Sequence, residues 1–220
     1  MRGGKDSTTF LEDALTRTET INESDISAGL VEKQQFWKNY WLKSYVYLSD
    51  KRLRDYYYGS LYILGITNRE GKNPAGLWGF NTTDTPAWTG DYHMNYNFEM
   101  PYNGVASSNR IELIKPFITV INNFIPYGKT WADKIHLREG RNIPQGQGGI
   151  VIPVGIGPYG AGASDTTLGQ KFNAAYAALY YLRTYYYTYD MQLLKEEIYP
   201  YLEQVALFWE HDLQKQPDGK

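Results

Sequence analysis

The chain of 220 residues contains no cysteine and only 3 histidines. The lack of cysteine excludes disulfides, zinc–thiolate centres and a thiol nucleophile. No apolar run approaches the roughly 20 residues that a membrane-spanning helix needs. The net charge is only −2 and the basic residues are scattered, so neither nucleic acid nor a membrane is an expected partner. With 42% hydrophobic residues, the chain can still bury a core of useful size.

Metal and phosphate sites are also poorly supported. His93, His136 and His211 are far apart and none stands in an HExxH-like arrangement, so no metal is expected. We expect His136 and His211 to be surface or packing residues on helices. The glycine-rich segment 146–162 holds neither a P-loop nor a dinucleotide-binding motif. No cofactor is therefore expected, and these glycines indicate sharp turns or a close approach to the backbone.

Aromatic residues, by contrast, are abundant: there are 21 tyrosines and 6 tryptophans. Tyrosine combines an apolar ring with a polar tip, so it suits packing between helices and the half-buried walls of a wet cleft.

Apolar residues recur at intervals of three and four along most of the chain, which predicts α-helices. Asp50 can cap the helix that follows it. We expect Pro126 to restart a helix, and Pro200 to kink one or restart it. The expected helices cover residues 10–18, 27–47, 51–67, 102–124, 126–137, 165–187 and 191–213.

Two long loops separate these helices, at residues 68–95 and 138–164, and the second contains an apolar run, Gly149–Val154, that is a candidate short strand. The helices at 27–47 and 51–67 read as an αα-hairpin. The pattern predicts an all-α protein built from helical hairpins, with functional loops collected at one end. We place a domain boundary after a polar segment at residues 1–26.

The most informative segment runs from Pro74 to Tyr102. It combines tryptophans, a histidine, asparagines and carboxylates with many glycines and prolines. Aromatic faces cover the C–H faces of a sugar, while short polar side chains bond its hydroxyls, so the segment suits a carbohydrate. Asp84, Asp91 and Glu99 are the local carboxylates, and spacing alone favours Asp91 and Glu99 as the acid and base of glycoside hydrolysis.

Three motifs in this segment resemble a known family: Pro74-Ala-Gly-Leu-Trp-Gly79, Pro86-Ala-Trp88 and Asp91-Tyr-His-Met-Asn-Tyr-Asn97. They are similar to the signature of glycoside hydrolase family 95, the inverting α-L-fucosidases. The similarity extends over about residues 30–220. It implies an (α/α)6 toroid of twelve helices, of which residues 27–220 would form the first half.

The resemblance also implies a site. The family's base is an Asn-x-Asn pair, which matches Asn95 and Asn97, and an Asp polarises the two amides so that they orient the attacking water. We expect these side chains to share one side of an extended backbone. Asp91 and Glu99 then become substrate contacts or supports. The expected substrate-binding residues are Trp78, Trp88, Asp91, His93, Glu99 and Tyr102.

The family's general acid, a Glu, would follow residue 220, and the assisting Asp later still. We therefore expect the C-terminal half of the toroid as a partner, and no hydrolysis by residues 1–220 alone. Phe80-Asn81 and Glu99-Met-Pro101 depart from the family's Trp-Asn and Gln-Met-Asn patterns, which leaves the sugar open.

Two alternatives remain on the same fold. One is a non-catalytic carbohydrate-binding scaffold, and the other is a related glycoside phosphorylase or polysaccharide lyase. The resemblance also suggests an exported bacterial protein that acts on glycans, in the periplasm or outside the cell.

Overall fold

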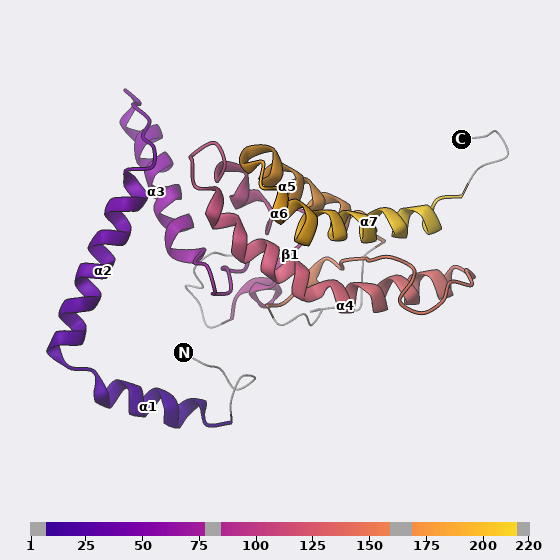
Figure 1. Cartoon of the computed structure of the whole chain (residues 1–220), viewed down its shortest axis with the longest axis horizontal. Helices are drawn as coiled ribbons and strands as arrows, with labels where there is room; N and C mark the ends of the chain where they lie inside the picture. Colours follow the sequence, from indigo (N-terminus) through magenta and orange to yellow (C-terminus); the bar gives the residue numbers. More distant parts are fainter. Residues whose placement is uncertain (1–7, 78–84, 159–168, 215–220) are drawn as a thin grey trace. The chain divides into compact units, whose positions relative to one another are not determined.

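The computed structural model describes residues 8–77, 85–158 and 169–214. Figure 1 shows that they are mostly helical, which confirms the all-α prediction. None of the described helices is long and apolar enough to cross a membrane. The α-helices are α1 (Phe10–Thr20), α2 (Glu23–Trp41), α3 (Lys51–Thr67), α4 (Lys115–Arg138), α5 (Asn173–Thr188), α6 (Met191–Leu193) and α7 (Tyr199–Asp212). The shorter elements are the 3₁₀ helices η1 (Ala87–Gly90), η2 (Met100–Gly104) and η3 (Ile111–Ile114), the π-helix η4 (Leu194–Ile198), and the strands β1 (Tyr92–His93) and β2 (Gly155–Ile156).

The chain divides into two compact units, residues 1–45 and 46–220. The first contains α1, which has no buried residue, and α2, which begins at an Asn22–Asp25 capping box. Each cap side chain binds the backbone N–H of the other, so two otherwise unpaired donors are satisfied. The predicted hairpin of residues 27–47 and 51–67 spans both units and stays a prediction, as does the boundary after residue 26.

In the second unit, α3 begins and ends where the sequence predicts. Asp50 caps it by accepting hydrogen bonds from the backbone N–H groups of Arg52 and Leu53. Its buried residues are Leu61, Leu64 and Gly65.

Pro126 does not restart a helix, because α4 runs unbroken through it for 24 residues. Proline removes one backbone hydrogen bond and crowds the preceding turn. The ring faces solvent, while residues on both sides of it, such as Phe124 and Gly128, are buried on one continuous face. We attribute the continuity of α4 to this packing, which offsets the local cost. Residues 102–114, expected as helix, form η2, turns and η3 instead.

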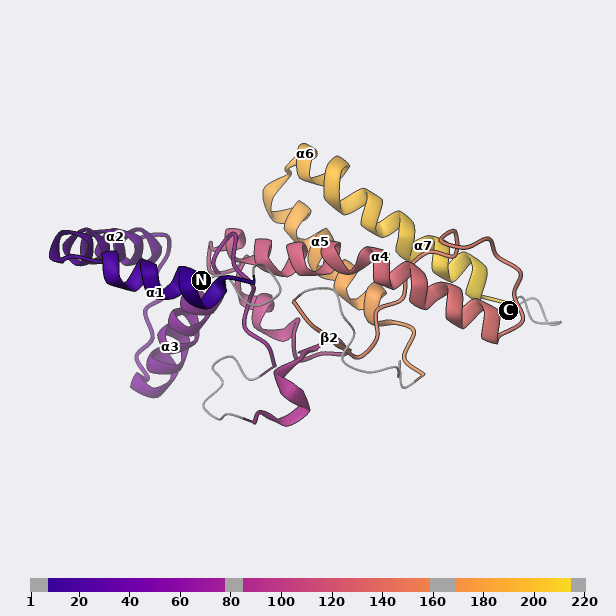
Figure 2. The same cartoon turned by 90° about the horizontal axis from the view of Figure 1, so that it is seen from below.

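Helices α5 and α7 form a hairpin through α6 and η4, and α4 lies alongside α7 in both views (Figures 1 and 2). Tyr181 and Tyr201 stack between α5 and α7 with ring centroids 4.2 Å apart. Their hydroxyls donate to Asn122 Oδ1 and the Ala174 carbonyl, so these fully buried phenols leave no donor unpaired. Pro200 is the second residue of α7, which directly follows the π-helix η4, so the regular α-helical pattern is interrupted just before this proline.

The apolar run Gly149–Val154 is not a strand; the strand prediction was wrong. The run is buried, but the backbone groups of residues 150–152 pair with three different helices rather than with one ladder. The Ile150 N–H donates to Gln204 O, the Val151 N–H donates to Gly128 O, and Ile152 O accepts from the Asn173 side chain. Gly149 has φ +75°, and a Cβ there would lie 2.3 Å from the Phe208 nitrogen. The close approach expected for the glycine-rich segment is therefore made here by α7.

Candidate functional site

Hydrogen bonds hold the segment of residues 74–102, which is expected to bind a carbohydrate. Strand β1 pairs antiparallel with β2, with Tyr92 opposite Ile156 and His93 opposite Gly155. The Tyr92 hydroxyl donates to the Pro74 carbonyl at 2.9 Å, and the Leu77 N–H donates to the Asp91 carbonyl at 2.9 Å. These contacts connect the two ends of a loop of which residues 78–84 lie outside the described part. Trp78 and Asp84, two candidate residues, fall there.

The candidate asparagines lie in a tight turn that follows β1. The Met94 N–H donates to the Val154 carbonyl, and the Phe98 N–H then closes the turn on the His93 carbonyl at 3.0 Å. The expectation of extended backbone was therefore wrong, because residues 94–99 are turns. Asn95 is half-buried and Asn97 is exposed.

Phe98 anchors this turn in the core. It is 2% exposed and stacks on Tyr92 and Phe117, with centroid distances of 4.3 and 5.3 Å. Aromatic contacts of this kind add about 0.5–1.5 kcal/mol beyond the area they bury. The turn that carries the two asparagines is thus fixed to α4 by one ring.

A carboxylate–imidazole pair lies immediately before the turn. His93 Nδ1 is 3.1 Å from Asp91 Oδ1, and the Trp88 ring centroid is 5.6 Å from that of His93. Burial raises the pKa of Asp91, and the hydrogen bond to His93 offsets part of this rise. Trp88 is 65% exposed and has φ 49°, a left-handed conformation that is uncommon for a bulky side chain. The structure thus brings an exposed aromatic face beside a hydrogen-bonded carboxylate–imidazole pair.

A mostly apolar cavity of about 610 Å³ opens next to the turn, and Asn97 lies on its wall. One face of α3 forms the opposite wall, with Tyr57 and Leu64 among its members. This volume is within the range of small-ligand pockets.

Two further candidates, Glu99 and Tyr102, lie in the interior. Glu99 is 0% and Tyr102 is 4% exposed. The Tyr102 hydroxyl donates to the Asn68 side chain at 2.6 Å, and burial raises the pKa of Tyr102 well above its usual value. Glu99 is closed off from solvent, whereas Tyr102 lies on the wall of the same cavity as Asn97. A substrate contact by either side chain stays a prediction.

Among the residues that the structure describes, no three His, Asp or Glu side chains gather as a metal site would require.

A family model, the glycosyl hydrolase family 95 catalytic domain, matches residues 18–220. The chain belongs to glycoside hydrolase family 95. No curated protein matches it. The match shows a glycoside hydrolase catalytic domain.

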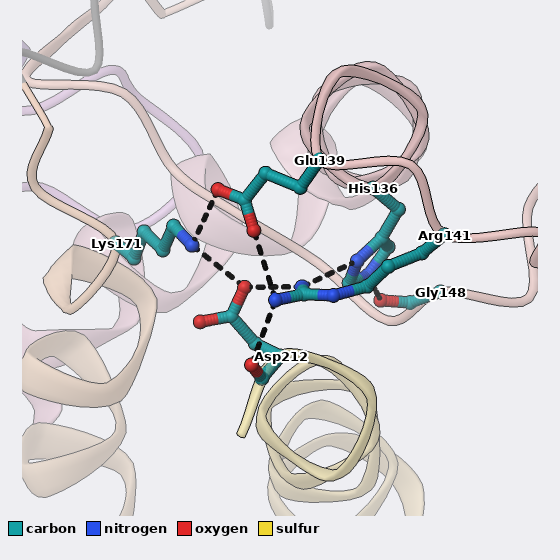
Figure 3. Close-up of polar contacts among 6 residues, drawn as sticks. All are labelled: His136, Glu139, Arg141, Gly148, Lys171 and Asp212. Atoms are coloured by element: carbon teal, nitrogen blue, oxygen red, sulfur yellow. Dashed lines mark hydrogen bonds and ion pairs between the residues drawn. The ribbon is translucent and has the colours of Figure 1, made fainter. Parts of the chain in front are cut away.

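This family 95 domain also contains a polar cluster that the sequence did not reveal (Figure 3). Asp212, at the end of α7, pairs with Arg141 and with Lys171, and Glu139 bonds the same two cations at 2.9 and 2.7 Å. Burial alone would raise the pKa of Asp212, but the hydrogen bonds and charges of Arg141 and Lys171 outweigh it and hold the pKa below its usual value.

His136 extends the cluster into the core, which confirms its packing role. Its Nε2 lies 3.0 Å from the Gly148 carbonyl, which can only accept, so Nε2 carries the proton. Nδ1 is then free to accept from Arg141 at 3.2 Å. Arg141 and Asp212 are 71 residues apart in the sequence. No local sequence pattern therefore predicts this cluster.

Proposed function

We propose that this domain is part of an inverting glycoside hydrolase of the α-L-fucosidase type, in which Asn95 and Asn97 orient the hydrolytic water. Amide oxygens are weak bases, so an Asp from another part of the protein would polarise them. Trp88 and His93 would line the sugar, with Trp78 and Asp91 as further contacts. The domain would form the first half of an (α/α)6 toroid.

The observation that supports this proposal best is the turn after β1. It holds Asn95 and Asn97 in the same short loop, beside the Asp91–His93 pair and the exposed ring of Trp88. Amide and carboxylate groups bond sugar hydroxyls, while an aromatic face covers their C–H surface. Rigid anchoring of the turn by Phe98 gives the fixed geometry that orientation of a water needs.

Hydrolysis with inversion also needs a general acid about 6.5–9.5 Å from the base. We propose that a Glu beyond residue 220 supplies it. Residues 1–220 alone should then give no turnover of an aryl α-L-fucoside, and turnover by the purified chain would contradict this assignment.

Product analysis of the complete enzyme tests the reaction class. We expect water to be the acceptor and proton NMR to show first the anomer inverted relative to the substrate. Retention would contradict the proposed water-orienting role. Phosphate-dependent cleavage would indicate a phosphorylase, an unsaturated product a lyase, and binding without cleavage a scaffold.

A further inference from the structure

The least explained buried group in the described chain is the Glu99 carboxyl. The residue is 0% exposed, and neither carboxyl oxygen has a hydrogen-bond partner in any other described residue. No described cation forms an ion pair with it, in contrast to Asp212, which has two. An ionised carboxylate in such a place would be strongly destabilising.

The groups around Glu99 cannot solvate a negative charge. Burial chiefly raises the pKa values of Tyr102, Tyr180 and Tyr201, and the Glu99 carboxyl adds to each rise. These phenols come from η2, α5 and α7. Each already donates its hydroxyl proton elsewhere, to Asn68, Asn103 and Ala174 respectively.

Burial raises the pKa of Glu99 to about 9, and this effect outweighs that of the backbone N–H of Glu99 itself, which favours the anion. At neutral pH the side chain is a neutral carboxylic acid, with one donor and one acceptor, and is close in shape to glutamine. A neutral acid can stay in this apolar site, whereas the anion favours any rearrangement that reaches water.

Glu99 is also part of the turn that carries the two asparagines. It follows Phe98, whose N–H closes the turn, and its own carbonyl accepts from the Tyr102 N–H at 3.0 Å. Movement of the Glu99 side chain towards water would therefore pull on the backbone that places Asn97.

We propose that Glu99 is a positioning residue that acts as a neutral acid: its uncharged carboxyl keeps the Asn95–Asn97 turn seated on the core, and its ionisation releases the turn. The inference rests on the proposed function only in assigning the turn to the active site. The release of the turn can be measured without any turnover.

The first test compares the unfolding of the wild-type chain and Glu99→Gln between pH 5.5 and 9. The folded pKa lies above the usual value of 4.5, so the unfolded state loses its proton first and stability falls as pH rises through this window. The ratio of the wild-type unfolding constant to that of Glu99→Gln should rise by up to about tenfold per pH unit. The exposed Glu203 provides the control, since Glu203→Gln should follow the wild type. A constant ratio for Glu99→Gln would overturn the proposal.

The second test follows the turn itself by NMR of a chain labelled with ¹⁵N-asparagine. The resonances of Asn95 and Asn97 should move between pH 7 and 9 in the wild type and stay near their neutral-pH positions in Glu99→Gln. Any effect of other groups near the turn persists in the variant and cancels in the difference between the two proteins. Identical titrations of the two proteins would overturn the proposal. A pH-dependent turn in an enzyme that does not hydrolyse glycosides would instead refute the proposed function alone.

Discussion

At the residue scale, Gly76 shows how one backbone contact shapes the site. A Cβ atom at this position would lie 2.0 Å from the Gly90 carbonyl oxygen. Backbone on the other side of the contact cannot rotate away as a side chain can. A glycine is therefore required at position 76, where the two ends of the loop meet next to the Leu77–Asp91 hydrogen bond.

Gly76→Ala should destabilise the second unit by about 1–3 kcal/mol, since the added methyl group forces the two backbones apart. Gly59 is a matched control inside α3, with open space around its Cβ position. Gly59→Ala should stabilise the protein by about 0.5–1 kcal/mol because alanine favours a helix. Urea denaturation of both variants measures the change in the free energy of unfolding, which should have opposite signs. The same change in both variants would refute the importance of the contact at Gly76.

The buried hydrogen bond from Tyr102 to Asn68 gives a second prediction. Tyr102→Phe leaves the Asn68 Oδ1 acceptor unpaired in the interior, which should cost about 1–3 kcal/mol of stability. Tyr186→Phe is the control, because that ring is 63% exposed and its loss of a hydroxyl should change little. Thermal denaturation compares the two, and a wild-type melting temperature in Tyr102→Phe would show that the bond is unimportant.

At the scale of elements, the Asp212 cluster connects the ends of α4 and α7 to Lys171, which precedes α5. Asp212→Asn weakens charge-assisted hydrogen bonds from two cations, so stability at pH 7 should fall by about 1–3 kcal/mol. The folded pKa is depressed, so this contribution is present above the usual value of 3.8 and is lost as pH falls through the folded pKa.

The difference between wild type and Asp212→Asn should therefore shrink in acid, as denaturation at pH 7 and pH 3 can show. Asp55 pairs with Lys51 on an exposed helix face, and Asp55→Asn should leave the melting temperature unchanged, as is usual for surface pairs. A difference for Asp212→Asn that does not depend on pH would contradict the charged role.

The sequence predicts those elements whose signals are local. Asp50 and the apolar spacing after it define α3 correctly. The restart at Pro126 was wrong because packing of both halves of α4 on one core outweighs a single proline. The strand at Gly149–Val154 was wrong because its partners come from three distant elements, and partner identity is not encoded in a short apolar run.

Some features of the candidate site can likewise be predicted from the local sequence, and others cannot. The aromatic and polar composition of residues 74–102 predicts a carbohydrate-binding segment, and the motifs that resemble the family make the asparagine pair the candidates. The turn geometry of residues 94–99, the burial of Glu99 and the cluster around Asp212 all depend on long-range contacts. They could not be read from local spacing.

At the scale of the whole molecule, the family match over residues 18–220 makes this a glycoside hydrolase catalytic domain. The described helices agree with an all-α architecture of helical hairpins, of which α5 and α7 form one (Figure 2). The site proposed here lies wholly in the unit of residues 46–220. The central claim about this site is that the turn after β1 supplies the groups that orient the attacking water.

The most direct test is steady-state kinetics of Asn95→Ala in the complete enzyme, with Asn123→Ala on the exposed side of α4 as the control. Loss of a group that acts in the transition state should lower kcat by about 10²- to 10⁴-fold with little change in KM. The control should retain wild-type values. A normal kcat in Asn95→Ala, with or without a raised KM, would contradict the account.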